Sequence, residues 1–245
     1  MVTTTFTANS LSALNTAIED IDAHGADAAP NTNYTINITG PISVTGGGLE
    51  ALNLLSGSSV RIEGMNTAGT SAAVEAIDGH GAERGFFVYS GDVTRQNLTL
   101  TDLSAGVNGN GGNGADGGGG GAGLGGGLFV ADGAIVTLTG VAFSSDSANG
   151  GGGGSATGSE NGRGGGGGMA GATGGNGGTN SSAGGGGGIG FGAQGRSANG
   201  PTTENPGSAG IVQGAAAGGQ GGFLAATGSG GGGGGGRGGG GGSAF

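Results

Sequence analysis

Hydrophobic and polar residues alternate over several short stretches in the first part of the chain. Tyr34–Thr39 (YTINIT) places its apolar side chains on one side, and Val60–Ile62 repeats the same alternation. A period of two is typical of half-buried β-strands. Gly, Asn, Ser and Asp separate the stretches, and these residues favour turns. The pattern therefore predicts an all-β protein built from short strands.

One segment near the N-terminus has the period of a helix instead. Leu11, Leu14, Ile18 and Ile21 follow one another at steps of three and four, which places them on one face of a helix. Ser10 is a good N-cap for this helix. Because the end of a strand array exposes core and unpaired strand edge, we expect the helix to cover that end. An ordinary surface helix is the alternative.

Two longer segments carry the same pattern of strand, polar-Gly turn and strand. The offset is 42 residues from Phe87 to Phe129 and 43 residues from Leu98 to Val141, so one residue is inserted near the turn. A repeated unit that cannot bury its own apolar face is typical of stacked arrays. We therefore expect coils of a parallel β-solenoid. The two matched segments are Arg84–Ala105 and Gly127–Ala148. In their alignment, Phe86–Val88 corresponds to Leu128–Val130, and Leu98–Leu100 corresponds to Val141–Phe143.

Arg95 interrupts the apolar pattern of the first repeat, at the position where the second repeat has Leu138. A β-bulge at Gln96-Asn97 would turn the side chain outward. The alternative is a buried Arg95 paired with Asp92 or Asp102. We expect the bulge, because burial of an unpaired charge costs several kcal/mol.

Glycine accounts for 74 of the 245 residues and is concentrated in runs that begin at Gly117. There is no strict Gly-x-y period, which excludes collagen. Extended glycine segments can bond to one another through their main chains, because no side chain intervenes. The sequence thus predicts polyglycine II-type helices in residues 150–245. The expected domains are 1–25 (strand and capping helix), 26–149 (β-helix coils with a Gly-rich insertion at 107–126) and 150–245.

The formal net charge is −10, with six Arg and no Lys. A chain without a basic patch is unsuited to nucleic acid, and an acidic one is repelled by anionic membrane surfaces. No window is apolar enough for a membrane span, so no membrane insertion is expected. The absence of Cys excludes disulfides and thiolate metal sites.

Several segments together resemble the start of passenger regions in large bacterial autotransporter and β-strand-repeat adhesin-type proteins. The resemblance covers roughly residues 3–190 and is most specific at Ile77–Gly150. It implies a right-handed parallel β-helix and an extracellular, cell-surface location. The segments are FTANSLSALNTAIEDID, YTINITGPIS, SSVRIEG, AIDGHGAERGFFVYSG, NLTLTDLSA, GLGGGLFVADGAIVTL and the Gly runs.

The segment Asp78-Gly79-His80-Gly81 contains a Gly-His-Gly that β-helix pectin-cleaving hydrolases also carry. This chain lacks the Asp-Asp pair, the Arg-x-Lys and the Asn-Thr-Asp that accompany it there. A catalytic His would also need carboxylates at the separations of glycoside hydrolysis. We therefore expect a structural turn. His24 lies at a helix C-terminus, where a His is unremarkable.

Two patterns raise the question of calcium. Gly111–Asp116 matches the first six positions of the GGxGxD nonapeptide, which works by stacking copies, and only one copy occurs. The second pattern is a set of Asp residues at expected turns. Asp is common in turns because its side chain forms hydrogen bonds with the turn backbone. No metal, cofactor or catalytic site is therefore expected. The acids are Asp92, Asp102, Asp132 and Asp146.

Three hypotheses for function follow from these patterns. The first is an extracellular structural or adhesive surface protein of the autotransporter-passenger type, which is not an enzyme and binds cell-surface or biofilm-matrix components. The second is a self-assembling filament subunit that stacks through solenoid ends and polyglycine helices, with itself as partner. The third and most remote is a β-helix polysaccharide lyase or hydrolase.

Overall fold

The computed structural model describes residues 3–46, 48–105 and 110–156, together with the single residues 164, 167, 168, 174, 176 and 187. The chain divides into two compact units. The first contains residues 1–104 and 125–147, and the second contains residues 105–124 and 148–245.

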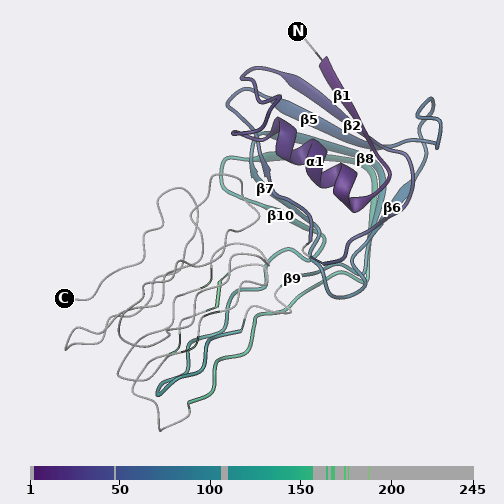
Figure 1. Cartoon of the computed structure of the whole chain (residues 1–245). Helices are drawn as coiled ribbons and strands as arrows, with labels where there is room; N and C mark the ends of the chain where they lie inside the picture. The colour runs from purple at the N-terminus through teal and green to yellow at the C-terminus, as the bar shows by residue number, and fades with distance from the viewer. Residues whose placement is uncertain are drawn as a thin grey trace. The chain divides into compact units, whose positions relative to one another are not determined.

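The described residues contain one α-helix and a series of strands (Figure 1). In chain order these are β1 (Thr3–Ala8), α1 (Leu11–Ile21), β2 (Asn33–Ile38), β3 (Ile42–Ser43), β4 (Leu52–Asn53), β5 (Ser59–Gly64), β6 (Glu75–Asp78), β7 (Phe86–Ser90), β8 (Asp92–Thr101), β9 (Ser104–Ala105), β10 (Leu128–Val130), β11 (Ile135–Ser144) and β12 (Ser147–Ala148).

The strands form three sheets. The largest has seven strands in the order β1-β2-β5-β8-β6-β3, with β11 also paired to β8. The second has the order β10-β7-β4, and the third contains β12 and β9. The pairs of the two larger sheets run parallel. An isolated antiparallel bridge joins Met65 and Ala72.

The strand β8 connects two parts of the largest sheet. Its first half pairs with β5 and its second half with β6. Asn97 lies between the halves with a φ of 54°. This left-handed residue shifts the alternation, so that Val93 and Leu98 both point inward although five positions separate them.

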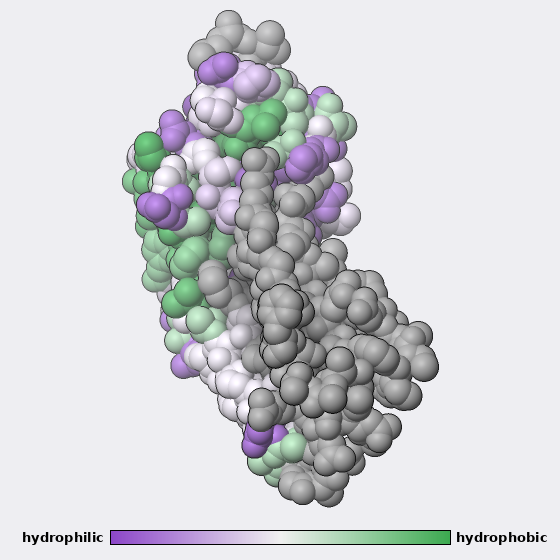
Figure 2. Space-filling model, turned by 90° about the vertical axis from the view of Figure 1, so that its left-hand side faces the viewer, coloured by the Kyte–Doolittle hydropathy of each residue, from purple (hydrophilic) through white to green (hydrophobic). Residues whose placement is uncertain are grey.

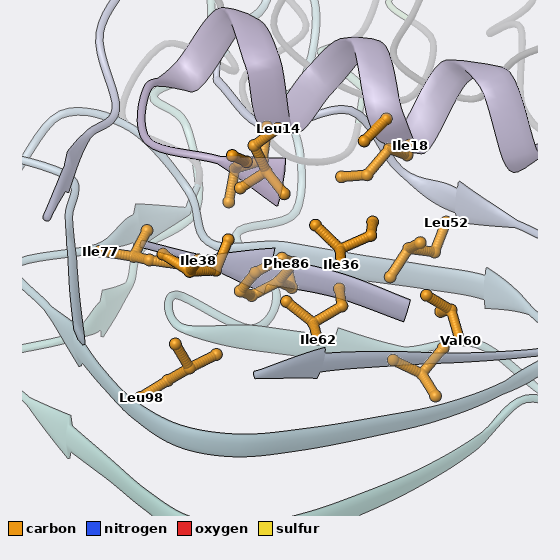
Figure 3. Close-up of a cluster of buried hydrophobic side chains, with 14 of the residues drawn as sticks. Leu14, Ile18, Ile36, Ile38, Leu52, Val60, Ile62, Ile77, Phe86 and Leu98 are labelled. Carbon is orange, nitrogen blue, oxygen red and sulfur yellow. The ribbon is translucent and has the colours of Figure 1, made fainter. Parts of the chain in front are cut away.

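The helix α1 packs its apolar face on the core. Ser10 accepts a hydrogen bond from the Ala13 N–H at 3.3 Å and caps the helix. Leu14 and Ile18 are buried in the same cluster as Ile36 and Ile38 of β2 (Figure 3). Each buried aliphatic side chain of this kind contributes about 1.5–3 kcal/mol. The helix predicted from the steps of three and four is confirmed at Leu11–Ile21.

The fold class predicted from the sequence, a right-handed parallel β-helix solenoid, is wrong. The strands gather in three sheets of seven, three and two strands, and β8 is shared between three neighbouring strands. The prediction treated the repeats as equivalent coils. The strands are unequal instead, because β3 and β4 have two residues each and β8 and β11 have ten.

The two matched segments nevertheless lie side by side in parallel pairs. Phe129 pairs with Phe87, and their rings stack with centroids 4.8 Å apart. Val141 pairs with Leu98 on the neighbouring strands. The offset changes between these two pairs, so the inserted residue lies in the turn before β11.

The described glycine segments of the second unit are joined through their main chains. Gly111 donates its N–H to the Gly152 carbonyl at 2.9 Å, and Gly154 donates to Gly118 at 2.8 Å. Gly114 and Ala156 form a parallel bridge. The polyglycine II helices predicted for residues 150–245 are not shown, and most of that range lies outside the described residues.

Arg95 is fully buried, and the outward orientation that the sequence suggested is wrong. The pairing of β8 with β11 keeps its register here, since Arg95 pairs with Leu138 and Gln96 with Thr139, and the shift of alternation at Asn97 comes only after Arg95. The one-residue offset lies in the preceding turn and therefore cannot rotate Arg95 outward.

Candidate functional site

The most distinctive surface of the first unit is the strand β11. Among the described strands it pairs only with β8, and no described strand pairs with its other edge. Its inward positions continue those of β8, where Leu100 is fully buried. Their counterparts on β11 are not covered, because Leu138 is 42% exposed and Phe143 is 46% exposed. Figure 2 shows hydrophobic residues, in green, among the described residues of one face.

The exposed residues of β11 carry no charge. The segment Ile135–Ser144 (IVTLTGVAFS) is uncharged in a chain with a net charge of −10. Ile135, on the opposite face of the strand from Leu138, is 60% exposed as well. Exposed apolar patches of this kind are typical of interaction sites. An open parallel strand edge also offers main-chain donors and acceptors to a further strand.

A second constellation surrounds the end of α1. Asp22 is buried and its Oδ1 accepts a hydrogen bond from the Asn53 N–H at 2.8 Å. Burial raises the pKa of Asp22 to about 8, the Asn53 bond opposes the rise, and Glu50 and Glu19 add to it.

Glu50 belongs to the same constellation. Burial raises the pKa of Glu50 to about 7, Glu19 adds to the rise, and Arg84 opposes it. Arg84 donates to the carbonyls of Gly85 at 2.8 Å and of Leu49 at 2.6 Å. Burial lowers the pKa of Arg84 to about 9, and Glu50 and Glu83 oppose this change. Ionisable groups with shifted pKa values also occur in purely structural networks.

The turn predicted at Asp78–Gly81 brings three polar side chains together. His80 has a φ of 51°, and its N–H donates to Asp78 Oδ1 at 2.8 Å. Its Nδ1 lies 3.6 Å from Asp78 Oδ2. Its Nε2 is in hydrogen-bond contact with Ser43 Oγ on β3. Ser43 was missed from the sequence, because only the parallel pairing of β3 with β6 places it beside Asp78.

The acids considered for calcium are not gathered into one site. Asp146 Oδ1 accepts from the Leu103 N–H at 2.9 Å, and burial raises the pKa of Asp146, with Asp102 adding to the rise. Asp92 is the first residue of β8, and Asp132 lies in the turn before β11. In the part of the chain that the structure describes, no three His, Asp or Glu side chains are grouped so that they could hold a metal ion.

The segment Gly111–Asp116 is engaged in main-chain contacts. Gly111 bonds to Gly152, and Asn113 Oδ1 accepts from the Ser155 N–H at 2.7 Å. The Asp116 carbonyl accepts from the Gly164 N–H at 2.9 Å. These bonds connect the segment to Gly152, Ser155 and Gly164.

Comparison with protein-family models, with curated proteins and with solved structures finds no match. Within the described ranges, no helix has the length and apolar character needed to span a membrane.

Proposed function

We propose that this chain is a structural or adhesive protein of a cell surface or its matrix, and that it associates with a second copy of itself through β11. The observation that supports this proposal is the exposure of Leu138 and Phe143, whose neighbours on β8 are fully buried. The extracellular location rests on the resemblance to passenger regions alone.

A second copy is the occupant that fits this surface best. An edge strand can pair with the same strand of another copy about a two-fold axis, because such an interface is self-complementary. Two molecules of charge −10 repel each other, so an uncharged surface such as Ile135–Ser144 is where their approach is least unfavourable. Pairing there would cover the apolar side chains and satisfy the open main-chain edge together.

The test is the association state of the purified protein, measured by light scattering and sedimentation over a wide concentration range. We expect a concentration-dependent dimer. Leu138→Glu should shift it to monomer, since a carboxylate would be buried in the apolar interface. Thr137→Glu is the matched control, because Thr137 adjoins Leu138 and points to the opposite face of the strand. The control should remain a dimer. A wild-type chain that stays monomeric at all concentrations would refute the proposal, and so would equal effects of the two substitutions.

A further inference from the structure

The side chains of Ser43, His80 and Asp78 are aligned in the order that nucleophilic acyl transfer requires. Ser43 Oγ contacts His80 Nε2, and His80 Nδ1 faces Asp78 Oδ2 at 3.6 Å. A hydroxyl is a weak nucleophile unless a neighbouring base takes its proton, and the base must be held by a third group. The geometry points to a hydrolytic site for small acyl esters, with Ser43 as nucleophile, His80 as general base and Asp78 as the residue that orients the imidazole.

The backbone holds His80 in a position that is unfavourable for most residues. Its φ of 51° is in the left-handed region, and the next residue, Gly81, has a φ of 71°. The Asp78 carboxylate stabilises this turn by accepting the His80 N–H. The same carboxylate therefore holds the main chain of His80 by a hydrogen bond and faces its ring at 3.6 Å. Strained conformations of this kind are concentrated at functional sites.

A donor for the developing oxyanion lies next to Ser43 Oγ. Val44 donates its N–H to the Asp78 carbonyl at 2.7 Å. Successive residues of a strand direct their main-chain groups to opposite sides, so the Ser43 N–H faces away from β6. β3 is the last strand of its sheet, and no described strand pairs with it on that side. The nucleophile's own N–H can thus bind the oxyanion, as an oxyanion-hole donor does.

The surroundings define the substrate class. Ser43 is exposed, and the side chains of His80 and Asp78 are 51% and 37% exposed. A methyl group added at Gly46 or Gly81 would have no atom within 4 Å. The site is open, and one main-chain donor gives limited stabilisation, so it suits small esters with good leaving groups rather than amides. The net charge of −10 disfavours anionic esters.

The reaction consumes only the ester and one water molecule. Ser43 Oγ forms a bond to the ester carbonyl carbon while its proton moves to His80 Nε2. The tetrahedral oxyanion then collapses, the bond to the alkoxy oxygen breaks, and His80 returns the proton to the departing alcohol. Water next attacks the acyl-serine with His80 as base. The products are a carboxylic acid and the free Ser43 hydroxyl.

The first test is covalent labelling of the full chain with a fluorophosphonate, followed by peptide mass spectrometry. We expect the label at Ser43, and we expect heat-unfolded protein to lose it. The exposed Ser71 serves as an internal control, because it has no described histidine partner. Equal labelling of Ser71 and Ser43, or no label at Ser43, would overturn the assignment.

The second test is hydrolysis of p-nitrophenyl acetate. Because a free surface imidazole also reacts with this ester, the two histidines of the chain are compared. Ser43→Ala and His80→Gln should each lower the rate roughly a hundredfold, whereas His24→Gln should leave it unchanged. Asp78→Asn keeps an acceptor for the His80 N–H and should lower kcat more than it changes KM. Equal losses in the His80 and His24 variants, or an active Ser43→Ala variant, would sink the proposal.

Discussion

The guanidinium carbon of Arg95 lies 3.8 Å from the centroid of the Phe86 ring. Arg95 is fully buried, and its Nε, Nη1 and Nη2 atoms have no hydrogen-bond partner. Burial lowers the pKa of Arg95 to about 9. A desolvated cation over an aromatic ring gains about 2 kcal/mol, whereas burying an ion costs several kcal/mol. The pair therefore offsets only part of the penalty, and Arg95 destabilises the fold.

Replacement of Arg95 by methionine tests this conclusion. Arg95→Met keeps an unbranched side chain over Phe86 and removes the charge, so the free energy of unfolding should rise by about 1–3 kcal/mol. Urea denaturation would measure the change. Arg61→Met is the control, because the Arg61 side chain is 50% exposed and its ion pair with Glu63 is worth less than about 1 kcal/mol. A less stable Arg95→Met variant would contradict the prediction.

The sequence predicted the local elements well because local residues determine them. The steps of Leu11, Leu14 and Ile18 gave the helix, and the alternation of Tyr34–Thr39 and Val60–Ile62 gave strands. The match of the two repeats also identified strands that are paired in the structure. Each of these features depends on a period that is readable along the chain.

The arrangement of the strands could not be obtained in this way. Nothing near Asp92–Thr101 shows that one strand is shared between β5, β6 and β11. The contact of Ser43 with His80 depends on the pairing of β3 with β6, across a separation of 37 residues. A buried Arg95 was the less favoured alternative, and its ring partner Phe86 was missed because it lies on a different sheet.

Asn97 provides a test of how β8 turns between its two partner strands. Its φ of 54° is tolerated by Asn and Gly but is unfavourable for a β-branched residue. Asn97→Val should lower the free energy of unfolding by about 1–2 kcal/mol, and Asn97→Gly should have little effect. The position opposite on β11 is Gly140, with a φ of 60°. Thermal unfolding distinguishes the two variants, and equal stability would show that the backbone conformation is not the determinant.

Asp22 should make stability depend on pH. Its pKa rises from 3.8 to about 8 on folding, so between these values the folded protein holds a proton that the unfolded chain releases. The contribution of Asp22 to the free energy of unfolding is therefore greatest below pH 4, and it falls as the pH rises towards 8. Glu50 acts in the same direction between 4.5 and about 7.

The variant Asp22→Asn removes this titration and retains an acceptor for the Asn53 N–H. We expect it to be more stable than the wild type at pH 8, and its melting temperature should fall less steeply between pH 5 and 8. Asp27→Asn is the control, because Asp27 lies close to Asp22 in the sequence but is exposed. Identical pH profiles for wild type and Asp22→Asn would show that Asp22 does not titrate in this range.

The glycine segments offer the sharpest steric test, because neighbouring glycines differ in the space around them. A methyl group at Gly117 would lie 1.9 Å from the Gly154 carbonyl oxygen, and one at Gly120 would lie 1.8 Å from that of Gly151. A methyl group at Gly119 would have no atom within 4 Å. None of these three glycines has a positive φ, so the comparison isolates the contact between the main chains.

Gly117→Ala and Gly120→Ala should separate the paired main chains, whereas Gly119→Ala should be tolerated. Hydrogen exchange is the suitable measurement, because Gly151 and Gly154 donate to Gly121 and Gly118 at 2.9 and 2.8 Å. Their amides should lose protection in the first two variants and keep it in the third. The same alanine substitution, placed one or two residues apart, therefore separates a steric requirement for glycine from a general effect of composition. Uniform protection in all three variants would show that main-chain pairing does not order this region.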